Sequence, residues 1–308
     1  MDFRTKVTIP AFDFSINHSN RIMMMGSCFA ESMAISLRDA GFQIDVNPFG
    51  TVYNPQSLAS GIRELISGKK YAISDLFQHQ GLYHSFSHHS RFSGISAEIC
   101  LENINQRIET SSDFLKNTTI LVVTYGTAYA YTLESTGKTV TNCHKLPENY
   151  FIRKRLSVEN IVDDWKELIG ELKSYNSNLK LLFTVSPIRH WKDGAHENQL
   201  SKSSLLLAID KLTHHYNFCY YFPSYEILMD ELRDYRFYAE DMLHPSSVTI
   251  EYIRERFSES FFSVQTRTKI QEWGNLHKSL NHKPFNPDSE EYKEFIQKTQ
   301  QKIKDFRF

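Results

Sequence analysis

Apolar runs alternate along the chain with stripes of apolar residues at helical spacing. Residues 21–25 form the first apolar run and predict a buried strand, and a stripe over 29–40 predicts a helix that ends at Gly41. Apolar and polar residues alternate over 42–46, as in a second strand, before a loop at 47–51. The chain therefore opens with a β-α-β unit.

The alternation resumes after an irregular segment, 61–99, which predicts an insertion over one end of the sheet. Residues 118–124 are apolar enough for a strand buried on both faces, and a hairpin with its turn at 135–138 is expected to follow. Later strands are predicted at 179–185 and 218–222. The helices predicted beside them are 158–172 behind the N-cap Ser157, 203–215, and a last helix after Pro245 that buries Val248, Ile253, Phe257 and Phe261. This alternation predicts a doubly wound parallel sheet.

The last part of the chain, 265–308, is polar and predicts a helical extension behind a main domain at 1–264. Its best helix starts behind Ser289 and carries these residues on one face: Tyr292, Phe295, Ile296, Thr299, Ile303 and Phe306. We expect this helix to pack against the main domain. The alternative is a helix that binds a partner protein, since exposed apolar stripes mark contacts.

Composition and charge narrow the class of protein. Of 308 residues, 41% are hydrophobic, which is enough to fill the core of a globular protein. Lys and Arg number 35 and Asp and Glu 36, so no charge of one sign covers the surface and nucleic acid is not expected as a partner. No apolar stretch near the start is long enough for a secretory signal or a membrane span, so we expect a cytoplasmic protein without a membrane partner. The oligomeric state stays open.

Neither the cysteines nor a cluster of histidines has the spacing of a metal site. The cysteines, which include no C-x-x-C pair and are predicted to be free thiols, are Cys28, Cys100, Cys143 and Cys219. The clustered histidines, which fit no zinc template and have no carboxylate among them, are His79, His84, His88 and His89. We therefore expect no metal and no other cofactor, and interpret these histidines as surface or lid residues.

Candidate chemistry is expected beyond the carboxyl ends of the strands, where open parallel sheets bind their ligands. The residues in such positions are Ser27, Gly50, Gly126 and Ser186. Ser27 also stands at the start of the first helix, where free N–H groups and the helix dipole favour a developing negative charge. This position suits a nucleophile, although a serine there is most often a simple helix cap.

A second motif favours the nucleophile. Asp241 and His244 lie three residues apart in the loop before the last core helix. A serine hydroxyl needs a neighbouring base, and that base needs a group that fixes its tautomer and stabilises its protonated form. The sequence thus predicts a triad in which His244 activates Ser27 and Asp241 orients His244.

The segment Gly26-Ser27-Cys28-Phe29-Ala30 resembles the signature after which the GSCFA family is named. Further segments resemble the same family, namely Asn47-Pro48-Phe49-Gly50-Thr51, Asn142-Cys143-His144-Lys145, Ser186-Pro187-Ile188-Arg189-His190 and Tyr238-Ala239-Glu240-Asp241-Met242-Leu243-His244-Pro245. The resemblance covers about residues 20–262. The chain is identified as a member of this family, which is similar to the wider SGNH/GDSL hydrolases.

This resemblance implies a flavodoxin-like, three-layer α/β/α sandwich and ester hydrolysis by a serine near the N-terminus with a D-x-x-H motif near the C-terminus. In the wider superfamily, the oxyanion hole combines the N–H of the nucleophile, a glycine N–H after the second strand and an asparagine amide after the third. Ser27 and Gly50 match the first two donors. No asparagine follows Gly126 in the third position, so Asn142 or Asn54 is expected to complete the hole.

The expected function is hydrolysis of acyl esters through an acyl-enzyme, with a small-molecule or carbohydrate ester as substrate and acetyl esters of carbohydrates suggested by the superfamily. The candidate substrate-binding residues are Arg189, His190, His144 and Lys145. Two alternatives stay open. One is transfer of the acyl group to a sugar or another alcohol, and the other is a ligand-binding module that has kept the pocket but lost turnover.

Overall fold

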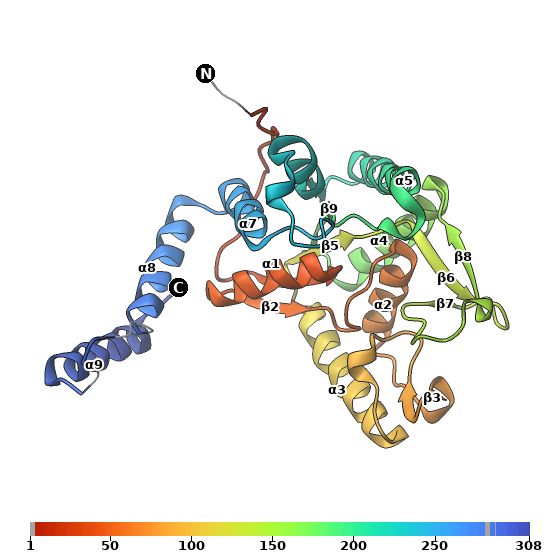
Figure 1. Ribbon diagram of the computed structural model, residues 1–308, viewed down its shortest axis with the longest axis horizontal. Coiled ribbons are helices and arrows are strands. Elements are labelled where there is room, and N and C mark those ends of the chain that lie inside the picture. The colour runs from red at the N-terminus through yellow and green to blue at the C-terminus, as the bar shows by residue number, and fades with distance from the viewer. Residues whose placement is uncertain (1–3, 281–283, 287) are drawn as a thin grey trace.

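The computed structural model of the chain, which describes residues 4–280, 284–286 and 288–308, contains a central parallel sheet (Figure 1). Its strands are β1 (Arg21–Gly26), β2 (Gln43–Val46), β5 (Ile120–Tyr125), β9 (Lys180–Val185) and β10 (Cys219–Phe222). They lie in the order β10-β9-β5-β1-β2, and each neighbouring pair is parallel. Counted along the chain, this is the order 2-1-3-4-5 of flavodoxin-like folds, which confirms the predicted fold class.

Helices cover both faces of this sheet. Successive residues of a strand point to opposite faces, so the apolar strands need a helical layer on each side. Met23 and Met25 pack on one side, whereas Ile22 and Met24 pack on the other. The first side is covered by α2 (Pro55–Ser67), α3 (Ala97–Lys116), α4 (Val158–Tyr175) and α5 (Gly194–His215). The second side is covered by α1 (Cys28–Asp39) and α7 (Ser247–Phe261). The structure is therefore the three-layer α/β/α sandwich that was expected.

Two helices extend into the segment predicted to be irregular, 61–99. Because α2 runs to Ser67 and α3 starts at Ala97, the insertion between them spans 68–96 and holds the hairpin of β3 (Phe77–His79) and β4 (Leu82–His84). Neither α2 nor α3 is predicted from the sequence pattern, and Gly61, a poor helix former, lies inside α2. A Cβ at Gly61 would lie 3.0 Å from two ring atoms of Phe49, so a larger residue there requires the ring to shift.

The helix predicted at 203–215 starts earlier, at Gly194. Its first turns bury polar residues toward the sheet, namely Asn198, Ser201 and Lys202. Apolar spacing is the signal by which a sequence reveals the buried face of a helix, so this polar start is missed.

The last core helix, α7, differs from the prediction at one position. Ile253, Phe257 and Phe261 are buried as predicted, but Val248 is 67% exposed. The next residue, Thr249, is buried instead, and its hydroxyl donates a hydrogen bond to the backbone oxygen of Phe237 at 2.6 Å. The first turn of α7 is thus attached by a polar contact, while its later turns pack through apolar side chains.

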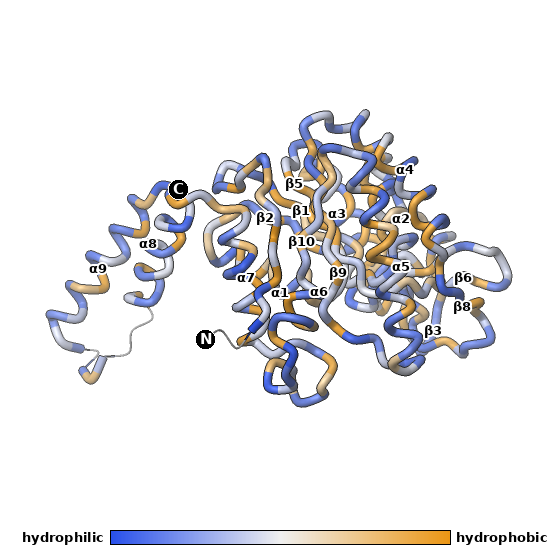
Figure 2. The backbone as a smooth tube through the Cα atoms, turned by 90° about the horizontal axis from the view of Figure 1, so that it is seen from above, coloured by the Kyte–Doolittle hydropathy of each residue, from blue (hydrophilic) through white to orange (hydrophobic). Residues whose placement is uncertain are grey.

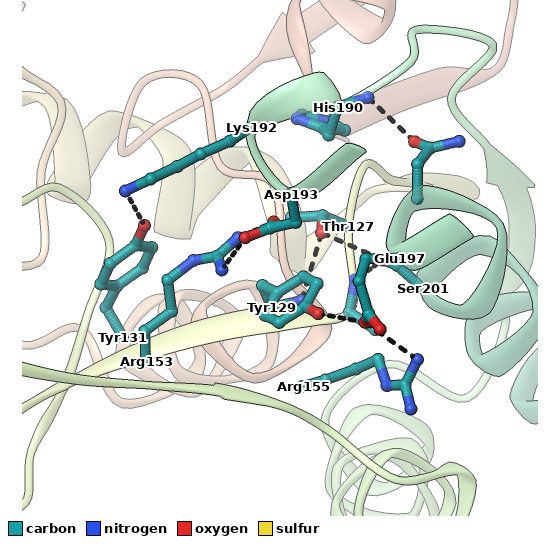
Figure 3. Close-up of polar contacts among 12 residues, drawn as sticks. Thr127, Tyr129, Tyr131, Arg153, Arg155, His190, Lys192, Asp193, Glu197 and Ser201 are labelled. Atoms are coloured by element: carbon teal, nitrogen blue, oxygen red, sulfur yellow. Dashed lines mark hydrogen bonds and ion pairs between the residues drawn. The ribbon is translucent and has the colours of Figure 1, made fainter. Parts of the chain in front are cut away.

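A second, antiparallel sheet consists of β6 (Tyr129–Leu133), β7 (Thr139–Val140) and β8 (Phe151–Arg155) in the order β7-β6-β8. The pairing of β6 with β7 confirms the predicted hairpin, whereas β8 is not predicted because its sequence is largely charged. Arg153 of β8 binds both carboxylate oxygens of Asp193 at 2.6 and 2.5 Å, and the hydroxyl of Tyr129 donates to Glu197 at 2.6 Å (Figure 3). These contacts attach the second sheet to the start of α5 and to the loop before it.

The C-terminal extension is a pair of helices, α8 (Val264–Leu280) and α9 (Glu290–Asp305). Ser289 caps α9 as predicted. However, α9 packs on α8 and lies away from the central sheet (Figures 1 and 2), so the prediction that it packs against the main domain is wrong. The extension is held instead by Trp273, whose Nε1 donates to the backbone oxygen of Asp39 at 2.9 Å, and by Phe308, whose ring stacks on His18. Partner binding by α9 stays a prediction.

All four cysteines are free thiols, as predicted. Among the helices in the described ranges, none combines the length and the apolar content that a bilayer span requires.

A buried ion pair connects the N-terminal segment to the second side of the sheet. Glu231, which follows α6 (Ser224–Glu226), binds Arg256 of α7, and the two residues are 3% and 6% exposed. Glu231 also accepts the N–H of Val7 at 3.0 Å, and Arg256 Nη2 donates to the backbone oxygen of Val7 at 2.7 Å. Each charge therefore has hydrogen-bonding partners that replace water.

We predict that Glu231→Ala lowers the free energy of unfolding by about 3–5 kcal/mol, because Arg256 then keeps a buried charge without its partner. Glu259→Ala is the matched control: Glu259 contacts the same guanidinium at 3.5 Å, but its side chain is 59% exposed. This control is expected to lose about 0–1 kcal/mol. Urea denaturation of both variants measures the difference, and equal losses would contradict a specific role of the buried pair.

Candidate active site

Ser27 lies where β1 ends and α1 begins, with its backbone extended at φ −70° and ψ 174°. Gly26 before it has φ +145°, and a Cβ at Gly26 would lie 2.3 Å from the backbone oxygen of Thr124, so no other residue fits beside β5. The side chain of Ser27 accepts no N–H of α1, which means that this serine is not a side-chain cap. Its hydroxyl is buried at the positive end of the helix and makes no hydrogen bond with any residue that the structure describes.

Asp241 and His244 form a preassembled pair in the loop before α7. His244 Nδ1 donates to Asp241 Oδ2 at 2.5 Å, and Asp241 Oδ1 accepts the N–H groups of Leu243 and His244 at 2.9 Å each. These two backbone hydrogen bonds and the one from the imidazole lower the pKa of Asp241 to about 2, so its carboxylate is charged. The aspartate thus holds the proton of His244 on Nδ1 and leaves Nε2 as the basic nitrogen.

No hydrogen bond joins this pair to Ser27 Oγ in the described part of the chain. The side chain of His244 is 50% exposed, whereas Ser27 is buried. Catalytic hydrogen bonds are often long in unliganded enzymes and tighten when the substrate binds. The role of the triad stays a prediction.

His190 lies near Tyr53 and near the loop that carries Asp241 and His244. Its ring is beside the ring of Tyr53, with centroids 5.4 Å apart, and the N–H of the preceding Arg189 donates to the backbone oxygen of Leu243 at 3.3 Å. Burial lowers the pKa of His190 to about 3, and the charge of His244 adds to this effect, so the imidazole of His190 is neutral. The fold therefore brings Arg189 and His190 to the loop that carries the aspartate and histidine.

Tyr53 extends this neighbourhood to the start of α1. Burial raises the pKa of Tyr53, and the charges of Cys28 and Glu31 raise it further. The backbone oxygen of Tyr53 accepts the N–H of Gly126 at 2.8 Å. The backbone of Tyr53 is thus attached to the end of β5, while the residue as a whole is 37% exposed.

Gly50 and Asn54 are two of the predicted oxyanion donors. Gly50 has φ +81°, and its N–H donates to the backbone oxygen of Asn47 at 2.9 Å; a Cβ there would lie 2.1 Å from His89. Asn54 caps α2, with its amide oxygen accepting the N–H of Ser57 and its amide nitrogen donating to the hydroxyl of the same serine. The amide of Asn54 is therefore engaged in the helix cap.

Asn142 lies in the long loop of the second sheet. Its amide nitrogen donates to Ser90 Oγ at 3.4 Å, which places Asn142 next to the segment that packs on Gly50. The following His144 is buried, with Nε2 at 2.8 Å from the backbone oxygen of Ser85, and burial lowers its pKa to about 4. The structure thus packs His144 against the insertion rather than against the loop of His244, while Lys145 beside it is exposed. The substrate-binding roles of both residues stay predictions.

The clustered histidines lie in the insertion, and two of them, His84 and His88, are buried, so the interpretation as surface residues is wrong for these two. His84 contacts Ser93 Oγ through Nδ1 at 2.6 Å and the backbone oxygen of His79 through Nε2 at 3.1 Å. His88 is buried against Phe49 and Phe92. Within the ranges that the structure covers, no three or more side chains of His, Cys, Asp or Glu gather in a way that could hold a metal ion.

Lys202 is a residue of this region that the sequence pattern did not reveal. It is 1% exposed, and its Nζ donates to the backbone oxygens of Gly126 and Ser186 at 2.7 Å each, at the carboxyl ends of β5 and β9. Burial lowers its pKa to about 7. A possible signal is its spacing of three residues from the buried Leu205, which places both on the inward face of α5.

Asn47, directly after β2, is a second such residue. It is 1% exposed and has φ +46°, and its Oδ1 accepts the N–H of Gly26 at 2.9 Å. The sequence offers two signals for it, which are its position beyond the carboxyl end of a strand and its place at the start of the family-like segment 47–51.

Comparison with known proteins gives a family and distant likenesses. No curated protein matches the chain in sequence. Among solved structures, it is similar to a family 3 carbohydrate esterase from Clostridium thermocellum, with 11% identity over 82% of this chain and 98% of that one and a TM-score of 0.37. An acetyl xylan esterase from the rumen bacterium Butyrivibrio proteoclasticus shares 10% identity over 83% of this chain and 65% of its own, with a TM-score of 0.40.

A family two carbohydrate esterase from Clostridium thermocellum, solved in complex with cellohexaose, shares 13% identity over 84% of this chain and 66% of its own, with a TM-score of 0.39. These likenesses are too distant to indicate an activity for this chain. The family models are specific by comparison, since the GSCFA family matches residues 21–257 and the C-terminal domain of GSCFA domain proteins matches 273–308. Because these two matches extend over most of its length, the chain belongs to the GSCFA family.

Proposed function

We propose that the protein is a serine hydrolase that cleaves acyl esters, with Ser27 as the nucleophile. The observation that carries this proposal is the state of the Ser27 hydroxyl, which is buried at the N-terminus of α1 and yet caps no helix and bonds no described residue. A buried polar atom without a partner lowers stability, so its presence beyond the end of a central strand favours a chemical role. The Asp241–His244 pair in the same chain supplies a base of the kind that a hydroxyl nucleophile needs.

The reaction proceeds in two steps. Ser27 Oγ attacks the carbonyl carbon while His244 Nε2 takes the hydroxyl proton; the bond to the alcohol then breaks and His244 gives the proton to the leaving oxygen. In the second step, water attacks the acyl-serine with His244 again as the base, which releases the acid and restores the serine hydroxyl. Asp241 stays charged throughout, because its pKa is about 2, and stabilises the protonated imidazole.

The oxyanion formed on the substrate is placed against the start of α1, where the free N–H groups and the helix dipole favour negative charge. The N–H of Ser27 is the proposed backbone donor. The N–H of Gly50 donates to the backbone oxygen of Asn47, so it can join the hole only if that bond opens, and a side-chain amide is the remaining proposed donor. Arg189 and His190 are the proposed substrate contacts, because they pack against the loop of His244. Acetyl esters of carbohydrates are the first substrates to test, and transfer to an alcohol would use the same acyl-enzyme.

We predict that a fluorophosphonate probe labels Ser27 and that Ser27→Ala abolishes both labelling and hydrolysis of a short-chain aryl ester. Asp241→Asn is expected to lower kcat by up to about 10⁴-fold, because the imidazole loses its orienting carboxylate. Ser32→Ala is the matched control: this serine lies one turn further along α1, and its hydroxyl donates only to the backbone oxygen of Cys28. Unchanged activity in Ser27→Ala would refute the proposal and move ligand binding without turnover to first place.

A pH profile separates the two imidazoles near the site. His190 has a pKa of about 3 and Asp241 one of about 2, so neither group changes its charge near neutral pH. The fall of kcat/KM toward acid near neutral pH is therefore expected to arise from neither of these two groups. In His190→Gln, the plateau value of kcat/KM is allowed to fall. The pH at which kcat/KM reaches half of its plateau is expected to be the same as in the native protein. A clear shift of this midpoint would assign the acid limb to His190.

A further inference from the structure

Asn47 holds the turn before the proposed nucleophile. Its backbone N–H donates to the oxygen of Met24 and its Oδ1 accepts the N–H of Gly26, each at 2.9 Å, so that its side chain continues the ladder between β1 and β2 where the strands end. The oxygen of Gly26 in turn accepts the N–H of Val52 at 3.0 Å. The loop after β2 therefore encloses the peptide groups of the residue directly before Ser27.

The orientation of the Asn47 amide follows from this contact. A backbone N–H can only donate, so the atom of the amide that faces Gly26 is the oxygen, and the NH₂ group is the end left over. That nitrogen, Nδ2, is buried and has no hydrogen-bond partner in the described part of the chain. The oxygen and the nitrogen of the Asn47 amide are attached to the same carbon, so Nδ2 lies close to the Gly26-Ser27 turn, where Oδ1 is bonded. The two N–H groups of Nδ2 are both unused by the described residues.

Two further unpartnered atoms belong to the same turn. Ser27 Oγ is buried without a partner, and so is Thr124 Oγ1 on β5, whose Cβ would lie 2.7 Å from a Cβ on Gly26. Three unpartnered polar atoms therefore lie around the end of β1, namely Ser27 Oγ, Asn47 Nδ2 and Thr124 Oγ1. They make no hydrogen bond with one another. Among these side chains, the amide of Asn47 offers only donors at its free end, which suits an acceptor oxygen.

We infer that Asn47 Nδ2 is the side-chain donor of the oxyanion hole, which binds the carbonyl oxygen of an acyl ester as it becomes negatively charged on attack by Ser27. The inference rests on the proposed function. It assigns to Asn47 the role of side-chain donor in the oxyanion hole, for which the sequence alone favours Asn142 or Asn54. The amide of Asn54 is engaged with Ser57, and that of Asn142 with Ser90. Asn47 has the free donor and the direct contact with the residue before the nucleophile.

Arg91 supports this placement from the insertion. Its Nη2 donates to the backbone oxygen of Asn47 at 2.6 Å and its Nη1 to Glu31 of α1 at 2.7 Å. The backbone oxygen of Asn47 also accepts the N–H of Gly50. Asn47 is therefore fixed through its backbone as well as its side-chain oxygen, and a rigid donor is what stabilisation of a developing charge requires.

The test compares Asn47→Asp with Asn47→Gly, because a donor role and a purely structural role predict different results. Aspartate keeps the oxygen that accepts the N–H of Gly26 but has no amide donors, and both replacements tolerate the positive φ of +46°. If Nδ2 is the donor, kcat for the aryl ester falls about 10²–10³-fold in both variants, with a much smaller change in KM. Thermal melting is expected to show a larger loss of stability in Asn47→Gly.

Wild-type kcat in Asn47→Asp together with a loss in Asn47→Gly would overturn the inference, since the oxygen alone would then suffice. Wild-type kcat in Asn47→Gly would overturn it as well. If Asn47→Asp does not fold, Asn47→Gly carries the test through rescue: acetamide, which supplies the missing NH₂ group, must raise its kcat, and no increase refutes the donor role. Asn17→Asp is the matched control, because Asn17 is exposed and its Oδ1 likewise accepts a backbone N–H, that of Ser19.

Failure of the proposed hydrolase function and failure of the Asn47 inference give different experimental results. If native protein shows neither labelling of Ser27 nor ester hydrolysis, the hydrolase itself is refuted before Asn47 is examined. If native protein hydrolyses the ester through Ser27 and Asn47→Asp does so equally well, only the role of Asn47 is refuted.

Discussion

The end of β1 approaches β5 so closely that only glycine fits at position 26, and the candidate site depends on this contact. A Cβ would meet the backbone oxygen of Thr124 at 2.3 Å, and the φ of +145° lies outside the range of ordinary side chains. The two peptide groups of Gly26 are also bonded to the loop after β2, through Asn47 and Val52. Ser27 therefore leaves the sheet in one direction only, into the first turn of α1, and rigid backbone holds this proposed nucleophile in position.

The carboxyl edge of the sheet is polar although the rest of the sheet is apolar. Buried Lys202 spans the ends of β5 and β9, and Asn47 and Thr124 carry buried polar atoms without partners in the described residues. Such groups lower stability, and proteins retain them where function requires them. Asp241 and His244 have the opposite environment, since both side chains are about half exposed. The proposed nucleophile is thus buried, whereas the proposed base is half exposed.

Two peripheral elements hold the loops of this edge. The second sheet binds the loop before α5 through the pairing of Arg153 with Asp193, and this loop carries His190 (Figure 3). The insertion binds the loop after β2 through Arg91 and through the N–H of His89, which donates to the backbone oxygen of Phe49 at 2.8 Å. Both elements lie outside the five-stranded sheet, and yet they hold the loops that carry Asn47 and His190.

The sequence by itself determined the alternation of strands and helices, the caps at Ser157 and Ser289, and the candidates Ser27, Asp241 and His244. Apolar spacing records which face of an element is buried, so it reveals elements that pack through apolar side chains. Only the tertiary structure decided that Lys202 and Asn47 are buried, that β8 pairs with β6, and that α9 packs on α8. A buried polar residue looks in sequence like a surface residue, and its partners lie far along the chain: Lys202 is 76 residues from Gly126, and Arg256 is 249 from Val7. Such contacts exist only once the chain has folded, because nothing in the local sequence specifies them.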